Sequence, residues 1–207
     1  TELREITEWK VPIFVKIAGA RPYYDTALAV KAGADVVVLD GMQGGTAATQ
    51  EVFIENVGQP TLACIRPAVD ALQDLDAHRE VQLIISGGIR NGADVSKALA
   101  LGADAVSIGS AAMIAIGDND PKWEKEYNKL GTTSGGYDDW HEGNDPAGIS
   151  TQDPKLMKRL DPVKAGRKLS NYLKVMTLEA QTIARACGKN NLHNLEPEDL
   201  CALTVEA

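Results

Sequence analysis

Cysteine is scarce in this chain of 207 residues, and its placement excludes several kinds of site. The three cysteines, Cys64, Cys187 and Cys201, lie far apart in the sequence and form no CxxC pair. Zinc and iron–sulfur sites built from neighbouring residues need closely spaced thiolate or imidazole ligands. We therefore expect no metal site made from local cysteines, and a reducing, cytoplasmic compartment in which the thiols stay free.

Long apolar runs and an excess of positive charge are also absent. No apolar stretch approaches the ~20 residues of a membrane-spanning helix, and no signal peptide is recognisable. The net charge of -8 argues against general binding to nucleic acid or to an anionic membrane, but it leaves room for a small basic pocket. Hydrophobic residues make up 44% of the chain, which is enough for a globular domain with a real core.

The chain does contain a repeated alternation of short apolar runs and helical patterns. Apolar runs without polar alternation predict strands buried on both faces, as in a parallel sheet covered by helices. We predict four such strands, at 11–17, 36–39, 83–85 and 105–108, each followed by a helix. Four right-handed β/α units make half of a (β/α)8 TIM barrel. We therefore expect an α/β fold that is the C-terminal half of such a barrel, with four further strands upstream.

After Gly117 the alternation stops. Residues 118–161 are polar and rich in turn formers, but they include two tryptophans and two tyrosines, which favours an ordered lid or subunit contact over a linker. An apolar stripe from Pro162 to Gly188 predicts a long helix, and Asn194 with Pro197 predicts the start of another. The chain is thus divided into a half-barrel (1–117), a long loop or lid (118–161) and C-terminal helices (162–207).

Two glycine-rich loops follow the last two predicted strands. Gly87, Gly88 and Arg90 come after the third strand, and Gly109 and Ser110 come after the fourth. Glycine lets a ligand approach the backbone closely. In TIM barrels the loops after the last two strands bind phosphate through backbone N–H groups and a helix N-terminus. Either loop alone is equally compatible with a tight turn, but the two together, with an arginine, favour a phosphate site.

Further candidates stand at the ends of the first two strands. Lys16 follows an apolar run, so its charge is expected to point toward the ligand end of the barrel; a snorkelling surface lysine is the alternative. The next loop contains Gln43, Gly44, Gly45 and Thr46. Its glycines let a flat ligand lie against the backbone, and its side chains offer neutral hydrogen bonds. A plain glycine-rich connector is the alternative here.

Three stretches, VPIFVKIAG, AVKAGADVVVLDGMQGGTAAT and LIISGGIRNGADVSKALALGADAVSIGS, together resemble the C-terminal half of the FMN-binding synthase domain of glutamate synthase. The later segments DPAGISTQDPKLMKRLDP and LEAQTIARACGKNNLHNLEPEDLCALT are similar to stand-alone glutamate-synthase-like subunits, including the large subunit of N-methylglutamate synthase. The SGGIR and IGS motifs occur in many FMN barrels, whereas GGTAAT and STQDP are more specific.

The resemblance implies an FMN enzyme that adds an amino group to 2-oxoglutarate and reduces the imine to glutamate or N-methylglutamate. It implies catalytic roles for Gln43 and for Lys16, which would lie beside the flavin ring and the 2-oxo acid. The positive charge of Lys16 would stabilise the anionic reduced flavin. The resemblance implies ring contacts for Gly44, Gly45 and Thr46, and phosphate contacts for Gly87, Gly88, Arg90, Gly109 and Ser110. An amine donor, a glutamine-amidotransferase-like subunit and an oligomer are expected. A non-catalytic FMN- or phosphate-binding subunit is the alternative.

Two features depart from the family pattern. Glutamate synthases place three cysteines of a 3Fe–4S cluster after the last barrel strand, whereas residues 113–153 contain none, so we expect no cluster bound by cysteines there. Gln43 stands where the family usually has an acidic residue, which alters the substrate site. Related FMN barrels fit less well. The 2-hydroxy-acid oxidases need a histidine, and IMP dehydrogenase a cysteine, in the loop 41–49, which has neither.

Overall fold

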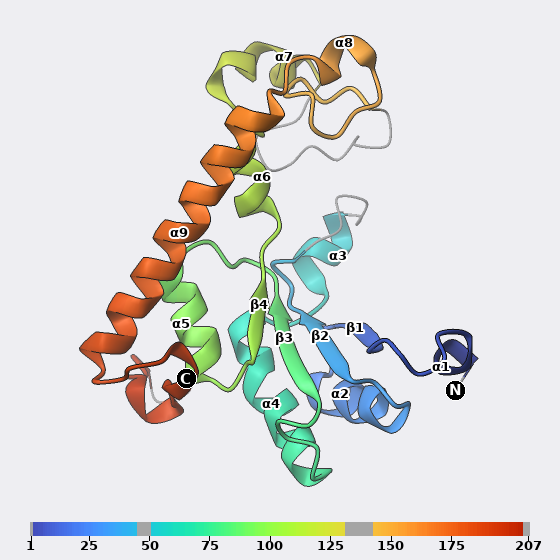
Figure 1. Ribbon diagram of the computed structural model, residues 1–207, viewed down its shortest axis with the longest axis vertical. Coiled ribbons are helices and arrows are strands. Elements are labelled where there is room, and N and C mark those ends of the chain that lie inside the picture. Colours follow the sequence, from blue (N-terminus) through green and yellow to red (C-terminus); the bar gives the residue numbers. More distant parts are fainter. Residues whose placement is uncertain (1, 45–50, 131–142, 205–207) are drawn as a thin grey trace.

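The computed structural model describes residues 2–44, 51–130 and 143–204. Its centre is a four-stranded parallel sheet in the order β1-β2-β3-β4 (Figure 1). The strands are β1 (Phe14–Ala18), β2 (Val36–Asp40), β3 (Gln82–Ser86) and β4 (Ala105–Ser107). The prediction of four parallel strands is confirmed, because every apolar run that was read as a strand contributes one.

Helices connect successive strands. The main ones are α2 (Pro22–Lys31), α4 (Thr61–Asp74) and α5 (Gly92–Ala100). Helix α6 (Ser110–Ile116) is the helix expected after the fourth strand. Two further short helices, α1 (Glu2–Ile6) and α3 (Glu51–Asn56), were not predicted from the sequence. The sequence of strand and helix is that of four consecutive units of a TIM barrel, so the half-barrel prediction is confirmed.

The two faces of the sheet differ in burial. Side chains alternate between the faces along each strand. Val37, Leu39, Leu83 and Ile85 are fully buried and form the core with residues of α2, α4 and α5. On the other face Phe14 is 55% exposed. This second face corresponds to the inside of the barrel, since the main contacts between helices and strands come from α2, α4 and α5, which form the core on the first face.

The chain after β4 forms short helices and then one long helix. The short ones are η1 (Pro121–Trp123), α7 (Glu124–Lys129) and α8 (Pro154–Met157). Helix α9 (Pro162–Ala186) then runs back beside α6 and α5 (Figure 1). Asp161 caps it by accepting hydrogen bonds from the backbone N–H groups of Val163 and Lys164. The predicted long helix is therefore confirmed.

The helix expected from Asn194 is wrong. The chain forms two single turns instead, η3 (Leu192–Asn194) and η4 (Pro197–Asp199), separated by Leu195 in an extended conformation. Leu195 is buried against Ala100 and Ala184, and this contact holds the extended backbone. Among the helices of the described ranges, none is both long and apolar enough to cross a membrane.

Candidate functional site

The carboxyl ends of the parallel strands lie along one edge of the sheet, and the predicted residues gather there. Gln43 follows β2, Gly87 follows β3 and Gly109 follows β4. Lys16 is the third residue of β1 rather than its last, because the strand continues to Ala18. The predicted residues Gly45 and Thr46 lie outside the described residues.

Lys16 forms an ion pair with Asp40, the last residue of β2. The distance from Lys16 Nζ to Asp40 Oδ2 is 2.6 Å. The other oxygen, Asp40 Oδ1, is buried and has no hydrogen-bond partner within the described part of the chain. Gly44 packs directly against this oxygen, so that a side chain at position 44 would collide with it. Sequence analysis missed Asp40, although its position directly after the apolar run VVVL was a usable signal.

Gln43 connects the loop after β2 to the start of α4. Its Oε1 accepts hydrogen bonds from the Thr61 backbone N–H (2.8 Å) and the Thr61 hydroxyl (2.7 Å). These two donors fix the orientation of the amide. Gly88 lies against Gln43, since a Cβ at position 88 would stand 2.9 Å from Gln43 Cβ. Gln43 is therefore held between two loops of the site edge.

The loop after β3 needs glycine for conformation as well as for space. Gly87 and Gly88 have φ angles of 109° and 71°, in the left-handed region that other residues rarely adopt. A Cβ at Gly87 would also lie 2.7 Å from Thr61 Oγ1 and 2.9 Å from Gly44 N. The loops after β2 and β3 thus contact each other through backbone. The glycines therefore allow these two loops to pack against each other at the carboxyl edge of the sheet.

Arg90 projects its side chain from the same loop. The guanidinium is 77% exposed, and its Nε lies 3.6 Å from Asp94 Oδ2. Two backbone N–H groups in the first turn of α5 already have hydrogen-bond acceptors. The N–H of Asp94 donates to Asn91 Oδ1 (2.9 Å), and the N–H of Gly92 donates to Glu179 Oε2 (2.6 Å). Arg90 therefore remains the accessible positive group of this loop.

The loop after β4 is open. Within the described ranges, no atom beyond the two chain neighbours lies within 4 Å of the place where a Cβ at Gly109 would stand, and Ser110, the first residue of α6, is exposed. The structure therefore brings both predicted phosphate loops to the same sheet edge and leaves space beside the second one.

Cys64 lies behind the site and does not face it. The thiol is fully buried, with Sγ 3.4 Å from the Pro60 carbonyl and 3.7 Å from the Gly19 carbonyl. Burial raises the pKa of the Cys64 thiol, which disfavours the reactive thiolate. Cys64 is therefore an inert structural thiol rather than a nucleophile of the site. Among the described residues no three potential ligands of the His, Cys, Asp and Glu types are close enough to hold a metal ion.

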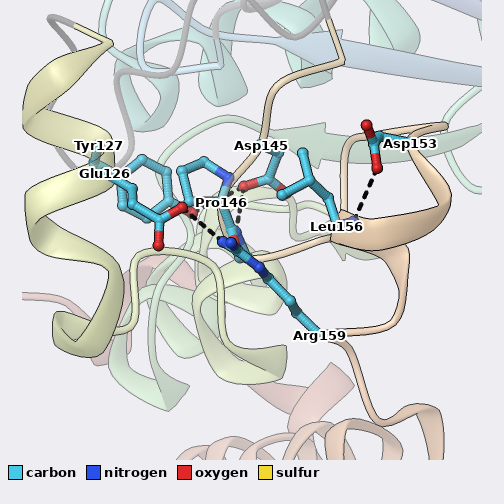
Figure 2. A network of polar contacts seen from close by, with 8 residues as sticks. Glu126, Tyr127, Asp145, Pro146, Asp153, Leu156 and Arg159 are labelled. Atoms are coloured by element: carbon cyan, nitrogen blue, oxygen red, sulfur yellow. Dashed lines mark hydrogen bonds and ion pairs between the residues drawn. The ribbon is translucent and has the colours of Figure 1, made fainter.

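A buried aspartate organises the described part of the segment 118–161 (Figure 2). Asp145 is 2% exposed and accepts hydrogen bonds from the Tyr127 hydroxyl (2.9 Å) and from the backbone N–H groups of Ala147, Ile149 and Ser150. These bonds fix residues 145–150 against α7. Sequence analysis noted the tyrosines of this segment but not Asp145.

Comparisons with known proteins agree with one another. A family described as the conserved region in glutamate synthase matches residues 1–121 and 137–190. The chain is 84% identical over 206 residues to a glutamate synthase large subunit-like protein of Rhizobium meliloti, covering 100% of this chain and 47% of that protein. It is 40% identical over 194 residues to an archaeal glutamate synthase (NADPH) of Methanocaldococcus jannaschii, covering 93% and 35%. The chain thus spans about half or less of the length of these relatives.

Solved structures with a similar fold include a flavocytochrome b2 double mutant with pyruvate bound. The TM-score is 0.60 at 16% identity, covering 99% of this chain and 39% of that one. A flavocytochrome b2 mutant with benzoylformate gives a TM-score of 0.57 at 19% identity, covering 98% and 38%. At this identity the similarity shows a shared fold.

Proposed function

This chain belongs to the glutamate synthase family, and from that premise we propose that it is part of an FMN-dependent enzyme that forms glutamate or N-methylglutamate from 2-oxoglutarate. One observation carries the proposal. Lys16 with Asp40, Gln43, and the glycine loops after β3 and β4 all lie at the carboxyl edge of one parallel sheet. This is the edge at which TIM barrels carry their active sites.

The described residues fit an FMN group. The open loop at Gly109 and Ser110 and the exposed guanidinium of Arg90 offer room and charge for a phosphate, with Gly87 and Gly88 close by. Gly44, followed by Gly45 and Thr46 in the sequence, would lie along the ring. When bound and reduced, FMN supplies the hydride that converts an imine into an amine.

Lys16 and Gln43 would act on the 2-oxo acid. Asp40 keeps the Lys16 ammonium at the site edge, where it can hydrogen-bond an anionic oxygen of the substrate or of the flavin edge. Gln43 has its amide oxygen occupied by Thr61, so only its NH₂ group is oriented for donation. A neutral donor at this position orients substrate without taking a proton from it.

The same proposal includes partners and surroundings. A source of ammonia or methylamine, such as a glutamine-amidotransferase-like subunit, and an oligomeric assembly are expected, in keeping with a relative named as large subunit-like. We also propose a cytoplasmic location. Because residues 113–153 contain no cysteine, we propose that electrons reach the flavin without an iron–sulfur cluster on this segment.

Flavin analysis of the full-length protein tests the proposal. The purified protein should be yellow, release FMN, and bleach on reduction. With reductant, 2-oxoglutarate, and either ammonia or methylamine, mass spectrometry should detect glutamate or N-methylglutamate. Iron and acid-labile sulfide should be substoichiometric on this chain. Bound flavin without either product would favour a non-catalytic FMN-binding subunit instead. Absence of flavin would contradict the FMN proposal and would leave the phosphate-binding subunit as the alternative.

A further inference from the structure

A polar cavity of about 210 Å³ lies away from the strand ends, between α6, η1 and the first turns of α9. We propose that this cavity binds a small multivalent oxyanion, either phosphate or a short dicarboxylate. None of its lining residues belongs to the proposed flavin site, so the inference does not depend on the function proposed above. The volume is smaller than the ~300–1,000 Å³ of pockets for larger ligands.

The charge of the cavity is opposite to that of the whole chain. Four cationic side chains line it, against two carboxylates, which gives +2 inside a chain of net charge -8. These residues are Lys122, Arg159, Lys164 and Lys168, with Asp120 and Asp161. An excess of one charge sign in a concave site attracts ions of the opposite sign.

Both carboxylates are already engaged. Asp120 pairs with Lys122 Nζ (3.0 Å) and accepts the Lys122 backbone N–H, while Asp161 accepts two N–H groups at the start of α9. The N–H and side chain of Lys122, and then the charge of Lys168, hold the pKa of Asp120 below its usual value. Because Asp161 caps α9, the helix N-terminus is occupied, and the cationic side chains must bind the anion.

Lys164 and Lys168 are the least compensated cations. They are four residues apart on α9 and therefore share one face of the helix. Neither forms a salt bridge with a carboxylate in the described ranges. Like charges at this spacing repel each other. An anion between the two ammonium groups would remove this repulsion.

Arg159 lines the cavity and is held by polar contacts to Glu126 and Pro146, which Figure 2 shows. Its Nη1 donates to Glu126 Oε2 (2.8 Å) and to the Pro146 carbonyl (2.9 Å), and its guanidinium lies 4.2 Å from the centre of the Trp123 ring. Lys122 Nζ lies 5.2 Å from the same ring. Groups that are fixed before binding lose little conformational entropy when a ligand arrives.

Titration calorimetry on the full-length protein tests the proposal, with inorganic phosphate and with glutarate as separate probes at constant ionic strength in chloride. At least one probe should bind. The double variant Lys164→Gln with Lys168→Gln should raise the Kd of that probe at least about tenfold. This lower bound corresponds to the loss of a single charge-assisted contact. The matched control is Arg167→Gln with Lys174→Gln, which removes two charges from the same helix outside the cavity and should change Kd less than about twofold, as screened surface charges do.

The two probes also identify the ligand class. Tighter binding of phosphate assigns a phosphate site, and tighter binding of glutarate assigns a dicarboxylate site. Binding of neither, or equal weakening in both double variants, would overturn the proposal. If the double variant does not fold, Lys122→Gln on η1 carries the same test, because it removes a cavity cation without altering α9.

Discussion

Lys16 Nζ lies 2.6 Å from Asp40 Oδ2, although the register places Lys16 opposite Val38. The lysine therefore reaches diagonally across the parallel pair, toward the carboxyl end of β2. Asp40 directs an ammonium from the middle of β1 to the edge where the loops meet. With 58% of the lysine side chain exposed, this pair adds at most about 1 kcal/mol to stability. The main effect of the pair is to place the Lys16 ammonium at the carboxyl edge of the sheet.

Lys16→Met should lower kcat per bound flavin at least about a hundredfold, because it removes a charged donor from the reacting edge. The free energy of unfolding should change by less than about 1 kcal/mol. Steady-state kinetics and urea unfolding measure the two effects. Lys31→Met, on the exposed side of α2, is the control. Full activity per folded molecule would assign Lys16 a structural role.

Arg90→Ala should weaken FMN binding by about 1.5–3 kcal/mol, the value of a charge-assisted hydrogen bond. Flavin fluorescence titration measures the change. Arg66→Ala is a matched control, because Arg66 also pairs with an aspartate four residues later, at 3.4 Å against 3.6 Å for Arg90. If both variants retain the same affinity as the parent, Arg90 does not contact the phosphate.

Gly92→Ala should destabilise the protein by about 1–3 kcal/mol through overpacking. A Cβ at this position would lie 2.5 Å from Ala180 N and from Met176 O, both backbone atoms of α9 that cannot move alone. Gly166→Ala on α9 is the control with the opposite sign. Apart from the backbone of its own helix, no described atom lies within 4 Å of a Cβ at Gly166, so this variant should stabilise the protein by about 0.5–1 kcal/mol. Urea unfolding compares the two, and similar effects would contradict the close helix crossing.

Asp118→Asn should raise the free energy of unfolding relative to the parent protein, and this gain should be larger at pH 7 than at pH 4. Burial raises the pKa of Asp118 above its ordinary 3.8, and the nearby Asp145 carboxylate adds to the rise. A raised carboxyl pKa contributes stability that is complete below the unfolded-state pKa and is lost as pH rises through the folded-state pKa. The variant lacks this loss, so its advantage over the parent should grow with pH.

Asp153→Asn provides the opposite case for the same unfolding measurements between pH 3 and pH 7. The N–H groups of Lys155 and Leu156 lower the pKa of Asp153, so its contribution is present above pH 3.8 and is lost as pH falls. This variant should be less stable than the parent at pH 7, and the difference should disappear in acid. The same pH trend in both variants would contradict the assigned environments.

The parallel sheet could be predicted because its evidence is local. Leu83 and Ile85 are buried under α4 and α5, and the apolar run that contains them is visible in the sequence. The glycine loops were predictable for the same reason, since Gly87 and Gly88 directly follow a strand. The bounds of β1 were predicted less closely, since the apolar run spans 11–17 whereas the strand is Phe14–Ala18.

The features that sequence analysis missed depend on residues distant in the chain. Asp40 acquires its role from an ion pair with Lys16 on the neighbouring strand and from its contact with Gly44. Asp145 is fixed by Tyr127, 18 residues earlier. The extended conformation of Leu195 follows from its packing against Ala100 of α5 and Ala184 of α9. No periodicity within a short window reports such contacts.

Helix α9 joins the cationic cavity to the N-terminus of α5, which directly follows the glycine loop after β3. Lys164 lines the cavity, and 15 residues later Glu179 holds the Gly92 N–H, a separation of about 22 Å at ~1.5 Å per residue. An anion that displaced α9 along its axis would alter the contact between Glu179 and Gly92. Thermodynamic reciprocity would then require flavin binding to change the affinity for that anion by the same factor. Through this one helix, binding at either site would change the affinity of the other.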